Sequence, residues 1–205
     1  MPEIVGGTND GYCQNGATSW SAARNHAGFS FDSNNSFDIN AVSHNYLVRR
    51  GTYIMRRAFF EFDTSGISIA PSVATLKIYG RTNGDGDIIA VRSLHGATLD
   101  ADDFRKGLAG TLSGDVDTAL TNSDGDPGGT GEGAGTLSGV SNFTYSAEID
   151  TWVLNAYNDI ALNATALADM ASLSLFKVCL MNYDRDYLDI DGGAAVYTGL
   201  RWAEN

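Results

Sequence analysis

The chain has 205 residues, of which 43% are apolar and 10% aromatic, so it can bury a core and is not a disordered acidic tail. Its formal net charge is −12, and 20 of its 25 acidic residues are Asp, which favours turns and caps, so the acidity belongs to loops and not to helix surfaces. A negatively charged surface repels phosphate, which excludes nucleic acid as an expected partner.

The first two predicted strands are 36–48 (SFDINAVSHNYLV) and 56–62 (RRAFFEF), in which apolar residues recur at every second position. Asn45-Tyr46 indicates a bend towards the end of the first run, and the turn formers of 63–66 (DTSG) close the second. The apolar positions expected to share a face are Phe37, Ile39 and Ala41 in the first strand, and Ala58, Phe60 and Phe62 in the second.

A hairpin is expected next. Residues 73–80 (VATLKIYG) alternate in polarity, 83–86 (NGDG) form a turn signal, and 87–94 (DIIAVRSL) return as a strand. The pattern predicts that these two strands pair with each other in antiparallel fashion.

The remaining elements are predicted from the same patterns: strands at 143–149, 159–162, 172–181 and 194–202, and short helices at 101–108 and 164–171, capped by Asp100 and Asn163. Eight to ten strands with two short helices and no strand–helix alternation predict an all-β fold, an antiparallel β-sandwich in one domain over 1–205. Residues 110–139 form a glycine-rich loop, either functional or an exposed insertion.

No catalytic signature is present in the sequence. His26, His44 and His95 lie alone in separate segments without metal-ligand spacing, and neither a GxSxG nor a P-loop pattern occurs. Glu61 and Asp63 share a strand face, as a glycosidase pair could, but a solvated row of charges is the favoured interpretation. We therefore expect no catalytic residues and no enzymatic activity.

Two acidic clusters make calcium the one metal to consider, because hard cations prefer clustered oxygens on loops. One cluster is Asp124 and Asp126 in the glycine-rich loop, and the other is Asp184, Asp186, Asp189 and Asp191 near the C-terminus. The candidate ligands are Asp124, Asp126, Asp189 and Asp191. Neither cluster matches the EF-hand pattern. We expect no cofactor, and structural calcium at these residues is the alternative.

Aromatic and acidic residues alternate in NYDRDYLD (182–189). Tyrosine rings beside carboxylates on a sandwich loop can stack on a sugar and bind its hydroxyl groups. The competing interpretation is a rim of tyrosines that covers the core. The candidate glycan-binding residues are Tyr183, Tyr187, Asp184 and Asp186.

Four of the 13 basic residues lie within nine positions: Arg49, Arg50, Arg56 and Arg57. On an acidic molecule such a cluster could dock on an acidic partner surface. Equally, arginine side chains could hold the Asp-rich loops of the same chain. The sequence does not separate the two.

Features of export and membrane insertion are absent. Residues 1–12 have neither a basic nor an apolar leader region, and no apolar run is long enough to span a bilayer. Either a leader has already been removed or the protein is made and used without export, and Met1 favours the second. Cys13 and Cys179 could form one bridge, which the sequence does not decide, and two free thiols are the favoured interpretation.

Several segments together resemble one family. RRAFFEFDTSGI (56–67) followed by SVATLKIYG (72–80) resembles the core of the DNRLRE-type jelly-roll domains of bacteriophage and environmental bacterial proteins. DGY (10–12), SWSAARN (19–25) and YNDIALNATALADM (157–170) are similar to further pieces of these proteins, whereas the ending TGLRWAEN departs from their usual Pro-x-Leu. The resemblance implies a carbohydrate-binding-module-like jelly roll without catalytic residues.

Related phage modules are found in tail fibres, tail tips and capsid decoration. The leading hypothesis is thus a non-enzymatic structural protein on a phage virion surface, assembled in the host cytoplasm with other capsid or tail proteins as a homo-oligomer, most plausibly a trimer that covers sheet edges. The alternative is a carbohydrate-binding or adhesin module, extracellular and calcium-dependent or not. A hydrolase is the third and weakest hypothesis.

Overall fold

The computed structural model of the chain describes residues 3–7, 9–25, 30–32, 37–47, 51–104, 137, 142–190 and 195–201. Nearly all of the regular structure in these residues is antiparallel β-sheet, accompanied by three short helices. The all-β prediction is therefore confirmed. The predicted glycine-rich loop at 110–139 lies outside the described residues except for Leu137, whose side chain is buried.

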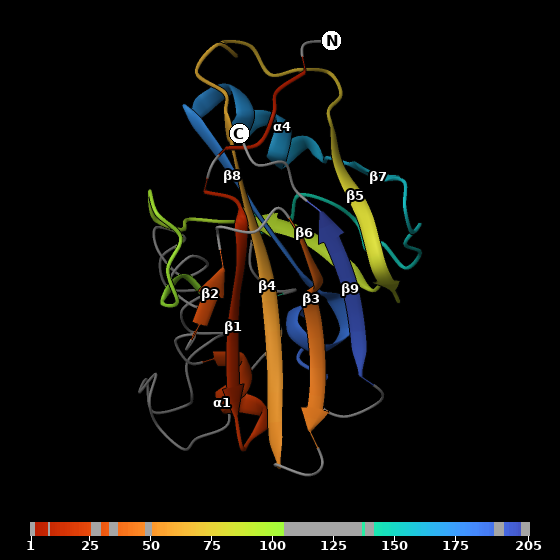
Figure 1. The fold of residues 1–205 in the computed structure, drawn as a ribbon. Coiled ribbons are helices and arrows are strands. Elements are labelled where there is room, and N and C mark those ends of the chain that lie inside the picture. The colour runs from red at the N-terminus through yellow and green to blue at the C-terminus, as the bar shows by residue number, and fades with distance from the viewer. Residues whose placement is uncertain are drawn as a thin grey trace.

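Within the described residues, nine strands form one curled sheet (Figure 1). Along its main path the order is β2-β1-β4-β3-β9-β5-β7, while β8 pairs with both β4 and β6. In chain order the strands are β1 (Gly11–Ala17), β2 (Ser30–Asp32), β3 (Phe37–Leu47), β4 (Thr52–Asp63), β5 (Thr75–Gly84), β6 (Ile88–Arg92), β7 (Tyr157–Ala161), β8 (Leu175–Asn182) and β9 (Val196–Arg201).

Strand β4 is the point at which the sheet divides. One of its edges pairs with β1. On the opposite edge, β3 pairs with residues 52–56 and β8 with residues 58–63. Two branches therefore start from β4: one continues through β3, β9, β5 and β7, and the other through β8 and β6. Figure 1 shows β8 and β6 passing behind the front layer formed by β1, β4 and β3.

The strands of the second branch are buried on both faces, which separates the interior into two apolar clusters. Successive side chains of a strand point to opposite faces, so neighbours in sequence enter different clusters. The cluster between the two branches contains Ala58, Phe60, Ala90, Val178 and Leu180, and the cluster on the other face contains Phe59, Val91, Cys179 and Met181. The predicted face of Ala58, Phe60 and Phe62 and the strand predicted at 172–181 are both confirmed.

The helices are α1 (Trp20–Asn25), α4 (Ala164–Ser172) and η2, a single π-helical turn (Tyr183–Tyr187). The prediction of α4 and its cap is confirmed, because the Asn163 side chain accepts a hydrogen bond from the N–H of Ala166 at 3.1 Å. Of the helix predicted at 101–108, only its first half is described, and there residues 103–104 are helical. Neither α1 nor η2 was predicted.

The predicted hairpin between 73–80 and 87–94 is wrong. Both edges of β5 are occupied by other strands, β7 on one side and β9 on the other. Strand β5 also runs on through Asn83-Gly84, so the first half of the turn predicted at 83–86 belongs to it. The chain turns later, at Gly86 and Asp87, which have φ of 75° and 56°, and then crosses to the other branch, where β6 pairs with β8.

Two smaller predictions also fail. No bend occurs at Asn45-Tyr46, because both residues stay paired with β4 to the end of β3. Residues 143–149 do not form a continuous strand, although isolated bridges at Thr144 and Ile149 and further backbone hydrogen bonds of Phe143 and Tyr145 join them to β6. The strands predicted at 159–162 and 194–202 are confirmed as β7 and β9.

Candidate functional site

The predicted glycan-binding residues lie on η2, directly after β8. Tyr187 is only 7% exposed and belongs to the apolar cluster with Phe59, and its ring stacks on Phe143 at a centroid distance of 6.5 Å. The Tyr183 ring stacks on Tyr187 at 5.5 Å and packs against the same cluster. Tyr187 is thus a core residue, as the alternative interpretation held, whereas Tyr183 and Asp184 keep part of their surface.

Asp186 is completely buried and is held by an arginine from the centre of the sheet. The Arg57 side chain donates from Nε and Nη2 to the two carboxylate oxygens of Asp186, each at 2.6 Å. Such a two-point bond between a guanidinium and a carboxylate is among the strongest polar contacts in proteins. Both oxygens of Asp186 are therefore occupied inside the protein, and this carboxylate has a structural partner in place of a sugar.

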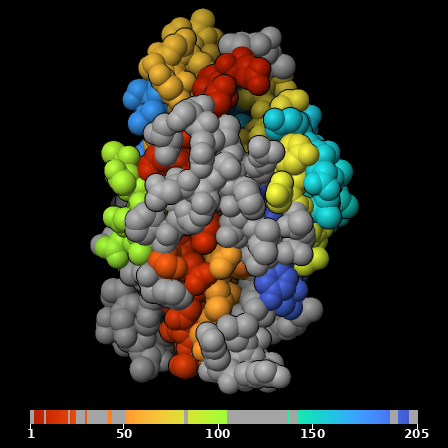
Figure 2. Space-filling model, in the orientation of Figure 1, coloured from red at the N-terminus to blue at the C-terminus, as the bar shows by residue number. Residues whose placement is uncertain are grey.

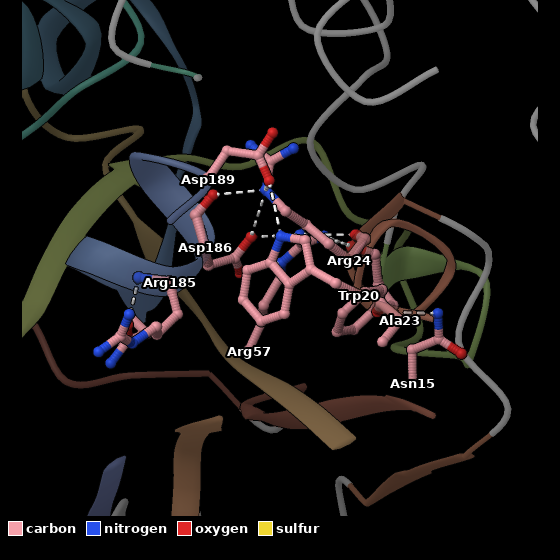
Figure 3. Close-up of polar contacts among 10 residues, drawn as sticks. Asn15, Trp20, Ala23, Arg24, Arg57, Arg185, Asp186 and Asp189 are labelled. Carbon is pink, nitrogen blue, oxygen red and sulfur yellow. Dashed lines mark hydrogen bonds and ion pairs between the residues drawn. The ribbon is translucent and has the colours of Figure 1, made fainter. Parts of the chain in front are cut away.

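A second buried arginine, Arg24 on α1, joins this pair (Figure 3). Its Nε donates to the backbone carbonyl of Asp186 at 2.7 Å and lies 3.5 Å from Oδ1 of Asp189. The same Asp189 oxygen accepts a hydrogen bond from the indole N–H of Trp20 at 2.9 Å. We call Arg24, Arg57, Asp186 and Asp189 the buried ion network. In Figure 3 the Arg185 side chain points away from it.

The remaining donors of Arg57 satisfy backbone carbonyls. Nη1 donates to the carbonyl of Phe104 and Nη2 to that of Arg24 at 3.0 Å, and the guanidinium lies over the Phe104 ring at 4.0 Å. The network therefore ties α1, β4, η2 and the segment ending at Phe104 together. For Arg57 the interpretation as an internal partner of an Asp-rich loop is confirmed. Arg56 bonds Gln14 at 2.6 Å, and Arg49 and Arg50 lie outside the described residues.

A second polar cluster, formed by Asp10, Glu61, His95 and Lys177, lies at the other half of β4. Oε2 of Glu61 is 3.9 Å from both Nε2 of His95 and Nζ of Lys177, and Lys177 donates to the carbonyl of His95 at 2.6 Å. Burial, aided by Lys177, lowers the pKa of His95 to about 3, so its imidazole is neutral at physiological pH. Its Nδ1 is 2.8 Å from Oγ of Ser93.

Asp10 is the unusual acid of this second cluster. It is buried, and its Oδ1 accepts a hydrogen bond from the N–H of Glu61 at 2.9 Å. Burial raises its pKa to about 7, with a smaller contribution from the charge of Glu61, while the hydrogen bond acts against this rise. Glu61 and Asp63 do not form a glycosidase-like pair, because Asp63 faces solvent and accepts hydrogen bonds from the N–H and Oγ of Ser65.

One hollow of about 370 Å³ lies beside the N-terminal half of α4, lined by Arg92, Asn142, Ala164, Thr165, Ala168 and Asp169. Its two charged residues face each other, with Nε of Arg92 3.5 Å from Oδ2 of Asp169. The same Asp169 oxygen accepts from the hydroxyl of Tyr145 at 2.6 Å. The charges of this hollow are thus already paired within the protein.

Of the predicted calcium ligands, the structure describes Asp189. Asp189 belongs to the buried ion network, while Asp124, Asp126 and Asp191 lie outside the described residues. No group of three or more His, Cys, Asp or Glu side chains with metal-binding geometry occurs among the described ones. Structural calcium therefore stays the alternative to the expected absence of a cofactor.

Cys13 and Cys179 are free and buried, as predicted. The Cys13 thiol donates to the carbonyl of Asp100 at 3.0 Å, and burial raises the pKa of both thiols well above the usual range. Both side chains are consequently inert parts of the apolar cluster around Phe59.

The sequence interpretation missed the contributions of Trp20 and Arg24. A local signal was present, since Ser19 precedes α1 and its Oγ accepts from the N–H of Ala22 at 3.3 Å. The same applies to η2, where Asn182 accepts from the N–H of Arg185 at 2.8 Å. No local signal could have paired Arg57 with Asp186.

Comparison of the chain with protein-family models and with curated proteins gives no match. Within the described residues, no helix is both long and apolar enough to cross a membrane.

Replacement of Asp186 by Asn is expected to lower the free energy of unfolding by about 3–5 kcal/mol, because the buried guanidinium of Arg57 loses its counter-charge. The measurement is urea unfolding followed by tryptophan fluorescence. Asp184→Asn is the matched control: it changes the net charge equally on the same turn but at a partly exposed side chain, and we expect a change within about 0.5 kcal/mol. Equal losses in the two variants would contradict the structural role of the network.

Replacement of Asp10 by Asn tests the second cluster through pH. The folded state holds the Asp10 proton up to about pH 7, whereas the unfolded chain releases it near the ordinary pKa of about 3.9. The contribution of this group to stability is therefore complete at low pH and is lost as the pH rises to 7. Asn cannot ionise, so the variant does not lose this contribution. Its free energy of unfolding, relative to that of the native chain, should therefore increase from pH 4 to pH 8 by up to about 4 kcal/mol. A difference that does not vary with pH would rule out this role for Asp10.

Proposed function

We propose that this chain is a non-enzymatic structural protein of a bacteriophage virion surface, a jelly-roll module of capsid decoration or of a tail fibre. The curled antiparallel sheet with its doubly buried strands is compatible with a sandwich of this kind. The resemblance of residues 56–67 and 72–80 to phage-associated jelly-roll domains supplies the link to virions.

The observation that carries the proposal is a group of exposed apolar side chains at one end of the molecule. Four large apolar side chains are exposed there: Val5, Ile69, Val73 and Leu175, with Ile69 81% exposed. The segments meet because Gly6 bridges to Phe62, and Leu175 pairs with Asp63 at the end of β4. The connection at 64–74 contains no charged residue, although the chain as a whole carries 38. Figure 2 shows the N-terminal segment and this connection side by side at that end.

An exposed apolar end on a strongly acidic protein is typical of a docking surface. On a virion it would rest on a neighbouring capsid or tail protein and leave the acidic remainder in solvent. The buried ion network adds support, because its charged groups are used to connect distant segments and not to face a substrate.

Antibody labelling of purified native particles in negative-stain microscopy is the direct test, and we expect the label on the particle surface. In a reconstitution with particles that lack this chain, Ile69→Lys should abolish attachment, because it places a charge in the apolar contact. Ile190→Lys is the matched control at another exposed apolar residue, and it should attach normally. Unlabelled particles would exclude the virion role.

The second candidate function is carbohydrate binding, and it rests on Tyr183 and Asp184. These are the two residues of the predicted glycan set that keep exposed surface, on the same turn of η2. Tyr183 presents an aromatic ring and Asp184 a carboxylate, the groups that stack on a sugar and bind its hydroxyl groups.

A glycan array with and without calcium tests this candidate. If a glycan binds, Tyr183→Ala should abolish the signal without unfolding the protein. Tyr187→Ala cannot serve this purpose, since its ring lies in the core and its loss is expected to destabilise the fold. Absence of glycan binding under both conditions would exclude carbohydrate binding and leave the virion role as the remaining candidate function.

A further inference from the structure

Strand β7 forms an open edge of the described sheet, since it pairs only with β5. The N–H of Gly80 donates to the carbonyl of Ala156, and the N–H of Leu162 to that of Ala74. These bonds show that the even-numbered residues between 156 and 162 direct their backbone N–H and C=O groups towards β5. In an antiparallel ladder the bonding positions alternate. The N–H and C=O groups of Tyr157, Asp159 and Ala161 therefore point outward, away from β5.

This edge is electrically neutral, in contrast to the chain as a whole. Residues 153–161 (VLNAYNDIA) contain one acid, Asp159, and its carboxylate lies 3.5 Å from the ammonium group of Lys77 on β5. Two copies of a molecule with a net charge of −12 repel each other over most of their surfaces. An approach of two copies along β7 avoids much of that repulsion.

An apolar flank accompanies the open edge. Val153, Leu154 and Tyr157 are all exposed, the last at 67%. Their loop is held in one shape by Asn158, whose side chain exchanges hydrogen bonds with both the N–H and the C=O of Val153 at 2.7 and 3.0 Å. Gly80 allows this close packing, since a Cβ there would lie 2.0 Å from the Val153 carbonyl. The flank is therefore preorganised, which lowers the entropic cost of association.

We propose that two copies of this chain associate through antiparallel pairing of their β7 strands about a two-fold axis. This inference does not depend on the virion role. The open edge of β7, its neutral charge and its apolar flank together support this pairing. Pairing about a two-fold axis gives a dimer in place of the trimer expected from the sequence.

The charges select the register of this pairing. Placing Asp159 opposite Asp159 of the second copy would bring like charges together and is unfavourable. A shift by two residues in the pairing places Tyr157 opposite Asp159 of the second copy, twice by symmetry. Each Asp159 then lies between Lys77 of its own chain and the Tyr157 ring of the other, and the Asn158 residues of the two copies face each other on the axis.

Sedimentation equilibrium of the full chain over a range of concentrations is the first test, and we expect a reversible monomer–dimer equilibrium. Tyr157→Asp should raise the dissociation constant at least tenfold, because it places a carboxylate opposite Asp159 of the second copy, and this like-charge pair occurs twice in a two-fold contact. Ile69→Lys, at the apolar end, should leave it unchanged, and circular dichroism should show that both variants are folded. A monomer at all concentrations, a trimer, or a dimer that only Ile69→Lys dissociates would overturn the proposal.

Cysteine cross-linking tests the register. The double variant Tyr157→Cys/Asp159→Cys should form a disulfide-linked dimer under mild oxidation, because the two positions face each other across the axis. Asp159→Cys alone should not, since in this register it faces Tyr157. Efficient cross-linking of the single variant would show the rejected register, and no cross-linking of the double variant would contradict pairing through β7.

Discussion

Strand β4 is buried on both faces, and one of those faces carries an arginine. Arg57 lies two positions before Phe59 and therefore on the same face of the strand, which faces an apolar cluster. The charge of this buried arginine must be neutralised inside the protein. Asp186 supplies the carboxylate, and backbone carbonyls from Arg24 and Phe104 accept the other donors. Because these partners come from α1, η2 and the segment at Phe104, the ion pair determines how the elements around β4 are positioned.

The same constraint bears on function. The buried ion network uses charged residues of the type that a catalytic site requires, but it directs them to each other and to the backbone. The network thereby connects α1, β4, η2 and the segment ending at Phe104, which is compatible with the assembly role proposed above. Its exposed apolar side chains gather instead at the end near Ile69 and along β7, with Ile190 apart from both. These surfaces are where contacts with other molecules are best supported.

Much of the secondary structure could be predicted because it depends on neighbouring residues. The alternation around Phe59 and Phe60 predicts a strand with two faces, and Asn163 caps α4 through a bond to a residue three positions away. Strand pairing could not be predicted in the same way. The expected hairpin of β5 and β6 failed because β9, from the end of the chain, occupies the edge of β5 that β6 would need. Of the predicted glycan residues, Tyr187 and Asp186 proved to be buried, which composition does not reveal.

The sequence by itself determined an acidic, turn-rich, all-β chain with no catalytic signature, since these properties follow from composition and from the two-residue repeat of strands. The tertiary structure decided which strands meet, which acids are exposed and which are internal. The bond from Arg57 to Asp186 spans 129 positions, whereas the cap at Asn163 spans three. A contact of the first kind depends on how the whole sheet divides at β4, and no local pattern carries that information.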